Sequence, residues 1–235
     1  MNTSSRRPVS RRERPAKPAL TRAGIVATAI TILRTEGLEK VTMRRLAQEL
    51  DTGPASLYVY VRNVAELHGA MLDELLAAAD LRVDTASSDW QQQLIALLSS
   101  YVRVLFAYPS LARSVLSLRP AGPHYLRLVD SLLALLRAGG VSQRRAGWGV
   151  DLLLQFAVAT AAEHGTRAES AETRDEDDAL AAALRDASAE EYPNIVATGP
   201  ELVSGTGPER LDWGIRALIR GIADTPALDD RAVAE

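Results

Sequence analysis

A group of arginine and tyrosine side chains in the first third of the sequence could bind a polyanion. Arg44, Arg45 and Arg62 flank or follow the short segment that contains Tyr58 and Tyr60. Guanidinium groups bind phosphate oxygens, and arginine and tyrosine side chains both contact nucleic-acid backbones. Tyrosines among cations are more typical of a phosphate-and-base surface than of an ordinary solvent-exposed face. This segment is therefore a candidate nucleic-acid interface.

The distribution of charge along the chain favours the same interpretation. Residues 1–70 carry twelve Lys or Arg and six Asp or Glu, whereas the other 165 residues carry fifteen and twenty-four. The net charge of −3 therefore conceals a basic first third, which favours a polyanionic partner there. Residues 1–18 contain five arginines and three prolines, and they predict a flexible basic arm. The alternative is a tail that only solubilises the protein.

The residue types that perform most enzyme and metal chemistry are scarce. The chain has no cysteine, and its three histidines, at 68, 124 and 164, are far apart in the sequence. Disulfides and thiolate sites are excluded, and little is left for a zinc site or a Ser-His-Asp triad. The segment 205–207 lacks the third glycine of a dinucleotide-binding loop, and the acidic run 169–178 lacks the spacing of a calcium loop. We expect no enzyme activity, no metal and no cofactor.

The apolar residues recur at helical spacing, and no useful alternating pattern predicts a strand, so we expect an all-α fold. Near the N-terminus, Thr21 and Asn63 are expected N-caps, and Gly37 is expected to end the first helix. The turn tripeptide 51–53 separates two short helices, which is the layout of a helix-turn-helix. The expected helices of this part span 21–37, 42–50, 54–60 and 63 to about 81.

The rest of the chain predicts a larger helical unit. A polar linker at 82–89 is followed by an amphipathic helix from Trp90, and the acidic run 169–178 is expected to be a solvated loop. The later helices are expected at 90–108, between Pro109 and Pro120, and at 126–136, 142–165, 178–189 and 208–222. The longest apolar run, 148–162, is too short to span a bilayer, and no apolar segment follows the basic N-terminus. We therefore expect a cytoplasmic protein without membrane contact.

The run 41–50 together with 55–63 resembles the TetR family of bacterial one-component repressors, and 29–38 is similar to the first helix of that family. More weakly, 118–120 and 211–215 are similar to the tetracycline-repressor type of C-terminal domain. The resemblance implies an all-α homodimer, with a three-helix DNA-binding head joined by a fourth helix to a ligand-binding and dimerisation body. The expected divisions are an arm at 1–18, a helix-turn-helix domain at 19–66, a body at 82–225 and a tail at 226–235.

The resemblance assigns roles in DNA binding to individual positions. Arg44 is expected to contact a base edge or a phosphate, and Thr42 to cap the second helix and touch a phosphate. Two positions depart from the family pattern: Val64 stands where lysine is frequent, and Asp51 where glycine is common. The expected DNA-binding residues are Thr42, Arg44, Arg45, Pro54, Ala55, Ser56, Tyr58, Val59, Tyr60, Arg62 and Asn63.

A second set of residues is expected to face a cavity in the body. The histidines that hold tetracycline and its magnesium in that family are not matched, so we expect a different ligand. Because the set is largely aromatic and aliphatic, it suits an apolar molecule with one anionic or carbonyl group. For most of these residues the alternative is plain core. The set is Tyr101, Leu105, Tyr108, Leu118, Arg119, His124, Trp148, Leu152, Gln155 and Phe156.

The expected function is that of a ligand-responsive repressor that binds a palindromic operator in double-stranded DNA as a homodimer, and that a small effector releases. An activator of the same family type is one alternative, and a sequence-independent DNA-binding protein is another. The apolar segment 148–162 and the stripe of Leu and Ile at 211–222 are expected to pair across the two-fold axis of the dimer.

Overall fold

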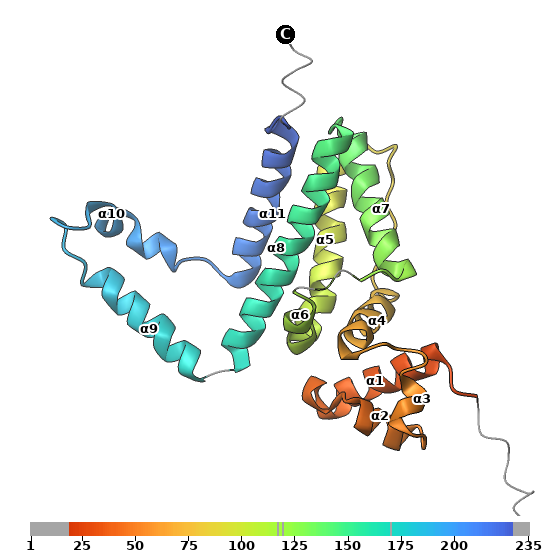
Figure 1. Ribbon diagram of the computed structural model, residues 1–235. Coiled ribbons are helices and arrows are strands. Elements are labelled where there is room, and N and C mark those ends of the chain that lie inside the picture. Colours follow the sequence, from red (N-terminus) through yellow and green to blue (C-terminus); the bar gives the residue numbers. More distant parts are fainter. Residues whose placement is uncertain (1–18, 117, 119, 170, 228–235) are drawn as a thin grey trace, which may run out of the picture.

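The computed structural model describes residues 19–116, 118, 120–169 and 171–227. The expectations for the arm at 1–18, for Arg119 and for most of the tail lie outside the described residues. Within the described ranges every regular element is a helix, which confirms the all-α expectation. The helices form a small head, a linking helix and a larger body (Figure 1).

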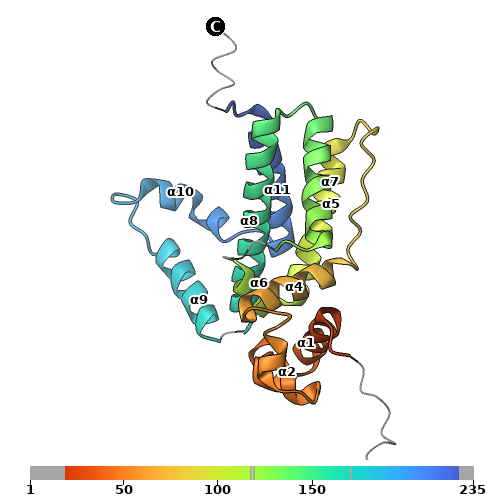
Figure 2. The same ribbon diagram turned by 45° about the vertical axis from the view of Figure 1, so that its right-hand side comes forward.

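The head consists of α1 (Arg22–Glu36), the 3-10 turn η2 (Leu38–Lys40), α2 (Met43–Glu49) and α3 (Pro54–Leu57). The linking helix α4 (Val64–Leu76) lies between the head and a bundle of longer helices (Figures 1 and 2). The bundle contains α5 (Trp90–Ala107), α7 (Pro123–Ala138), α8 (Gln143–Glu169) and α11 (Gly207–Asp224), with the short α6 (Pro109–Val115) near α4. The helices α9 (Ala171–Arg185) and α10 (Pro193–Leu202) project together from the side of the bundle.

Local capping sets the ends of the head helices, as the sequence predicted. The hydroxyl of Thr21 accepts a hydrogen bond from the amide of Gly24 at 3.0 Å, and that of Thr42 accepts one from Arg45 at 3.1 Å. Pro54 occupies the first turn of α3, where its missing N–H costs nothing. These caps depend only on residues close in the sequence, and they mark where each helix begins.

The helices of the head are held together by buried side chains that belong to the same hydrophobic cluster as those of the body. Ile25 on α1, Leu46 on α2 and Leu57 on α3 are completely buried and belong to one hydrophobic cluster. Burying such a side chain contributes about 1.5–3 kcal/mol relative to leaving it exposed. The three contacts therefore hold α2 and α3 at a fixed angle against α1.

In the body, α8 and α11 pack closely against one another. A Cβ atom at Gly149 would lie 2.7 Å from Cγ2 of Ile222, so only glycine permits this approach. Ile215, Ile219 and Ile222 are buried within the subunit. We expected the apolar stripe of the last helix to face a second subunit. Most of this stripe is instead buried in the core of its own subunit.

Two helices end earlier than the sequence predicted. The third helix closes at Leu57, because the amides of Tyr60 and Val61 both donate to the Leu57 carbonyl in a turn. The linking helix closes at Leu76 rather than near residue 81. Leu81 is instead anchored on α7, where it is buried and its carbonyl accepts a hydrogen bond from the Ser131 hydroxyl at 3.0 Å. A local turn therefore follows the third helix, whereas a tertiary contact holds the segment after the linking helix.

The prediction of an irregular, acidic loop at 169–178 was wrong. The backbone is helical in α8 up to residue 169 and in α9 from residue 171. The prediction rested on six acidic residues and on the absence of any apolar residue larger than alanine, but the glutamates among these acids are strong helix formers. The stretch before Pro208 was also expected to be irregular, but it contains α10, which begins at Pro193 and packs on α9.

Across the described residues, no single helix is long and apolar enough to cross a membrane. Taken together, α5 and α6 have the length and the apolar composition of a membrane-spanning segment. These two helices, however, meet at a bend of 107°.

Candidate nucleic-acid interface and ligand cavity

The tip of the head exposes side chains that an ordinary helical pair would bury. Leu57 points into the core, whereas Tyr58, Val59 and Tyr60 are 52%, 80% and 37% exposed. Pro54, Ala55 and Ser56 are exposed as well. This is the geometry of a helix-turn-helix, in which the second helix presents small and aromatic side chains to the major groove.

The structure gives the two neighbouring arginines of α2 different surroundings. Arg44 is exposed and no hydrogen bond or ion pair occupies it in the described part of the chain. Arg45 instead bridges two carboxylates, at 2.6 Å from Glu36 and 2.7 Å from Glu49. These hydrogen bonds raise the pKa of Arg45 and hold the pKa of Glu36 below its ordinary value. Arg45 therefore joins α1 to α2 within the head, and of the two only Arg44 is free for a ligand.

Three further residues predicted to bind DNA also have structural roles. The hydroxyl of Thr42 caps α2, and the side-chain oxygen of Asn63 caps α4 by accepting the amide of Glu66 at 2.8 Å. The Arg62 amide and guanidinium both donate to the Glu66 carboxylate, which lowers the pKa of Glu66, although the Arg62 side chain remains 87% exposed. These residues set the angle at which the exposed tip leaves the head.

A cavity of about 330 Å³ lies between the body and the linking helix, and it is lined by α4, α5, α6, α7 and α8 and by the segment after α6. Eight of its twelve lining residues are apolar and four are polar, a mixture that small-molecule sites also show. The lining residues are Leu72, Tyr101, Val115, Leu116, Leu118, Pro120, Tyr125, Asp151, Leu154, Gln155, Val158 and Ala159.

Three of the residues predicted to bind a ligand line this cavity: Tyr101, Leu118 and Gln155. The others lie elsewhere, with the exception of Arg119, which is outside the described residues. Leu105 is buried in the core, and Phe156 packs beside Gly214 of α11. His124 is half-buried at the start of α7 and does not reach the cavity wall. Tyr108 faces a separate cleft, and Trp148 and Leu152 lie on the outer face of α8, at 58% and 45% exposed.

The polar groups of the cavity come from α5, α7 and α8. Tyr101 is 1% exposed, and burial raises the pKa of its hydroxyl far above the ordinary value, so this group remains a neutral hydrogen-bond donor. The amide of Gln155 donates to the carboxylate of Asp151 one turn earlier. Sequence reasoning missed Asp151 and Tyr125. The position of Asp151, four residues before Gln155 on an otherwise apolar helix, was the signal that could have found it.

A buried carboxylate connects the linking helix to one wall of the cavity. Asp73 on α4 is 7% exposed and accepts a hydrogen bond from the backbone amide of Tyr125 at 2.8 Å. It thereby caps α7 from a neighbouring helix. A Cβ atom at Gly122 would lie only 2.1 Å from the Asp73 carboxyl carbon, so glycine is required at this approach.

Replacing Asp73 with alanine should lower the free energy of unfolding by about 1–3 kcal/mol, because the partly buried Tyr125 amide would lose its partner. The measurement is urea-induced unfolding followed by circular dichroism. Glu74, the exposed neighbour of Asp73, is the matched control, and Glu74→Ala should change stability by less than about 0.5 kcal/mol. Equal stability of the Asp73→Ala variant and the parent would show that this cap contributes nothing.

The neighbouring helices α8 and α11 each carry exposed apolar or small residues. Trp148 and Leu152 are exposed one turn apart on α8, and Trp213 is 73% exposed on α11. Ala217 and Gly221, which follow Trp213 at successive turns, are also exposed. We refer to these five residues as the α8–α11 face. Exposed tryptophans on neighbouring helices indicate a contact surface for another molecule.

A helix-turn-helix head with an exposed tip, linked by one helix to a larger helical body with a cavity, is the architecture of a transcriptional regulator. Residues 84–225 match the family model for the tetracyclin repressor-like C-terminal domain. The chain belongs to the TetR family of transcriptional regulators.

Similar bacterial proteins agree with this assignment. A putative transcription regulator of Streptomyces coelicolor, SCO7704, has 53% sequence identity and a TM-score of 0.76, over 90% of this chain and 98% of that structure. ActR of Streptomyces coelicolor, a TetR family protein solved also in complex with actinorhodin, has 34% identity and a TM-score of 0.79 over 87% of this chain and 97% of its own. An HTH-type transcriptional regulator of Saccharopolyspora erythraea is 30% identical over 91% of this chain and 89% of its length.

Proposed function

We propose that this regulator is a repressor that binds a palindromic operator as a homodimer and is released by a small, largely apolar effector. The observation that carries the proposal is the position of α4. This helix begins directly after the exposed tip, at its cap Asn63, and Leu72 on the same helix lines the cavity. Since α4 is 13 residues long, it spans about 20 Å. A molecule in the cavity therefore contacts the element that positions the head.

The head supports recognition of the major groove. Exposed Arg44 is suited to a base edge or a phosphate, and Ser56, Tyr58 and Tyr60 present polar and aromatic groups beside it. One head covers only a few base pairs, so specific binding requires two heads on successive grooves. Two-fold symmetry then requires a palindromic operator, with half-sites separated by about one helical turn or a multiple.

The α8–α11 face supports assembly into the dimer. An isologous contact repeats one patch on both subunits, and the antiparallel pair α8 and α11 would form a four-helix interface with its copy. The exposed residues at the centre of the face are small at Ala217 and Gly221 and large at Trp148 and Trp213. Such a surface allows bulky side chains of one subunit to fill the space above small residues of the other.

The cavity supports an aromatic effector with a polar group. Its apolar walls suit a polycyclic body, and the Tyr101 hydroxyl and the Gln155 amide can meet a carbonyl or carboxylate oxygen. ActR, which shares a third of its sequence with this chain, was solved in complex with the compound actinorhodin. That complex supports a small organic molecule as the effector here, and the cavity walls favour an aromatic one.

Selection of bound sequences from random DNA by the purified full chain tests the proposal. A palindromic consensus is expected, and release of that DNA by a polycyclic aromatic carbonyl compound should follow. A reporter gene downstream of the selected site should be silenced by the regulator and restored by the compound. Activation of the reporter would favour the alternative of an activator, and the absence of any consensus would favour sequence-independent binding.

Replacing Gln155 with leucine, or Tyr101 with phenylalanine, should weaken effector binding by about tenfold each, because each change removes one hydrogen bond to the effector. The measurement is titration calorimetry with a compound that releases the operator, such as anthraquinone-2-carboxylate or a related hit from thermal-shift screening. Leu126→Ala on the outer surface of α7 is the control and should bind as the parent does. Unchanged affinity in both cavity variants would place the effector elsewhere.

A further inference from the structure

Among the residues whose burial the structure describes, Asp73 of α4 is the one charged side chain in the core. It is 7% exposed, and the other buried polar side chains are the hydroxyls of Ser100 and Ser131. Burying a carboxyl group is costly unless hydrogen bonds compensate it. Asp73 finds a partner in a distant part of the chain, because it accepts the backbone amide of Tyr125 at 2.8 Å. This contact joins α4 to the first turn of α7.

The start of α7 needs a cap from outside the helix. Its N-cap is Gly122, which has no side chain, and its first residue is Pro123, which has no backbone N–H. The amides of the first helical turn lack partners within the helix, and a negative group beside them is also favoured by the helix dipole. The Asp73 carboxylate supplies this cap, so the N-terminal end of α7 rests on α4.

The contact between the two helices leaves no free space. A Cβ atom at Gly122 would lie 2.1 Å from the carboxyl carbon of Asp73, and 2.2 Å and 2.4 Å from its oxygens. The φ angle of Gly122 is −80°, which any residue can adopt, so glycine is needed here for space alone. The first turn of α7 is therefore in close contact with the Asp73 side chain.

The same contact belongs to the wall of the ligand cavity. Tyr125, which donates the hydrogen bond, lines the cavity, and so does Leu72, the residue before Asp73. Leu118 and Pro120, in the segment that leads into α7, line it as well. A molecule in the cavity therefore touches residues on both sides of the Asp73–Tyr125 hydrogen bond.

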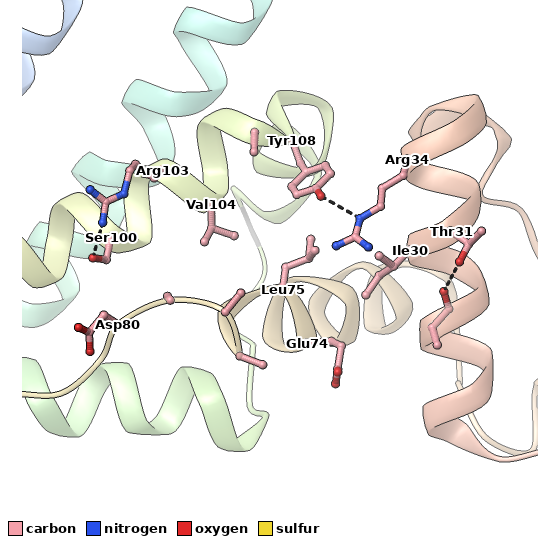
Figure 3. A pocket seen from close by; sticks show the side chains of 15 residues that line it. Ile30, Thr31, Arg34, Glu74, Leu75, Asp80, Ser100, Arg103, Val104 and Tyr108 are labelled. Carbon is pink, nitrogen blue, oxygen red and sulfur yellow. Dashed lines mark hydrogen bonds between the residues drawn. The ribbon is translucent and has the colours of Figure 1, made fainter.

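The linking helix connects this contact to the head. Asn63, which follows the exposed tip, and Asp73 are ten residues apart, about 15 Å along a helix. On another flank of α4, Leu75 lines an open cleft together with Ile30 of α1 (Figure 3). A displacement of α4 at Asp73 thus reaches the head at both the tip and α1.

We propose that the contact of Asp73 with Tyr125 and Gly122 transmits effector binding from the cavity to the head, so that Asp73 is a positioning residue for release of the operator. This inference rests on the proposed function, since it requires both an operator and an effector. Separating the two helices would leave the buried carboxylate without its partner, which is costly, so α4 follows the first turn of α7 when a molecule in the cavity displaces it. Without the contact, α7 moves and α4 stays in place.

The coupling between the two sites tests the inference. It is the ratio of the operator dissociation constants with and without saturating anthraquinone-2-carboxylate, measured on the full chain by fluorescence anisotropy. In the parent the compound should raise the dissociation constant about 5- to 150-fold. Asp73→Ala and Gly122→Ala break the contact from opposite sides, and each should lower this ratio by about threefold or more. Asp73→Asn should keep most of the coupling, because its amide oxygen can accept the same hydrogen bond.

The matched control is Asp89→Ala, which removes an exposed aspartate that caps α5 by accepting the amide of Gln92 at 3.3 Å. It should leave the ratio as in the parent. A purely structural role of Asp73 would lower the melting temperature and leave the ratio unchanged, because the ratio compares two affinities of the folded protein.

An unchanged ratio in Asp73→Ala and in Gly122→Ala would overturn this inference and leave the proposed function intact. A ratio near one in the parent would instead overturn the proposed function, and this inference with it. If Asp73→Ala does not fold, the result for Gly122→Ala decides alone.

Discussion

Glutamate in place of Trp213 and Leu152 should convert the proposed dimer into monomers that no longer hold the operator. Both side chains are largely exposed within one subunit, so the change should leave the subunit folded. In the dimer it would place four carboxylates in an apolar interface, where unpaired charges are costly. Since two linked heads gain about 10²- to 10⁴-fold in avidity over one, operator affinity should fall by a similar factor. Analytical ultracentrifugation and a DNA titration measure the two effects.

The matched control is Leu126→Glu, which places the same charge at an exposed leucine of α7, away from the α8–α11 face. That variant should remain dimeric and bind the operator as the parent does. Thermal unfolding of the double variant checks that its subunit is intact. If the Trp213 and Leu152 variant is still a dimer at micromolar concentration, the dimer interface lies on another surface.

Replacing Arg44 with alanine should weaken binding to the selected operator by about 1–3 kcal/mol for each half-site in which Arg44 reads a base edge. A dimer presents Arg44 to both half-sites, so the expected total is about 2–6 kcal/mol. Affinity for random duplex should fall much less, because an interaction with a base edge carries sequence information that an interaction with a phosphate does not. The measurement is fluorescence anisotropy with both duplexes at one fixed salt concentration.

Two other arginines serve as references for Arg44. Arg137→Ala, at the far end of the body, should leave both DNA affinities unchanged. Arg45→Ala should mainly lower the stability of the head, because Arg45 is held by Glu36 and Glu49. An equal loss on operator and random DNA would reassign Arg44 to phosphate binding, and no loss on either would place it outside the interface.

The amino-acid sequence by itself determined the local features of the head. Thr21, Thr42 and Asn63 cap their helices as predicted, because a cap is a contact between residues three positions apart. The tripeptide 51–53 and Pro54 produced the turn and the start of α3 for the same reason. The periodic apolar residues of the body likewise predicted long helices and an all-α fold, since helical spacing is a property of one segment alone.

The sequence was less informative about the directions in which side chains point. It placed Trp148, Leu152 and Gln155 together in a cavity, because all three belong to one apolar helix. The structure places Gln155, itself exposed, at the rim of the cavity and the other two on another face, since packing of α8 against α5, α6 and α11 decides where each side chain points. A periodic pattern cannot divide a helix that is apolar almost all round.

Only the tertiary structure decided which charged groups are free. Arg44 and Arg45 are adjacent and chemically identical in the sequence, yet Glu36 of another helix occupies one and leaves the other exposed. Asp73 meets Tyr125, and Arg34 meets Tyr108, across separations of more than fifty residues. Such contacts depend on how the helices pack, because chain distance does not limit which side chains become neighbours. The helix caps and the helical periodicity could therefore be predicted from the sequence. The partners of the buried and charged groups were determined only by the packing of the helices.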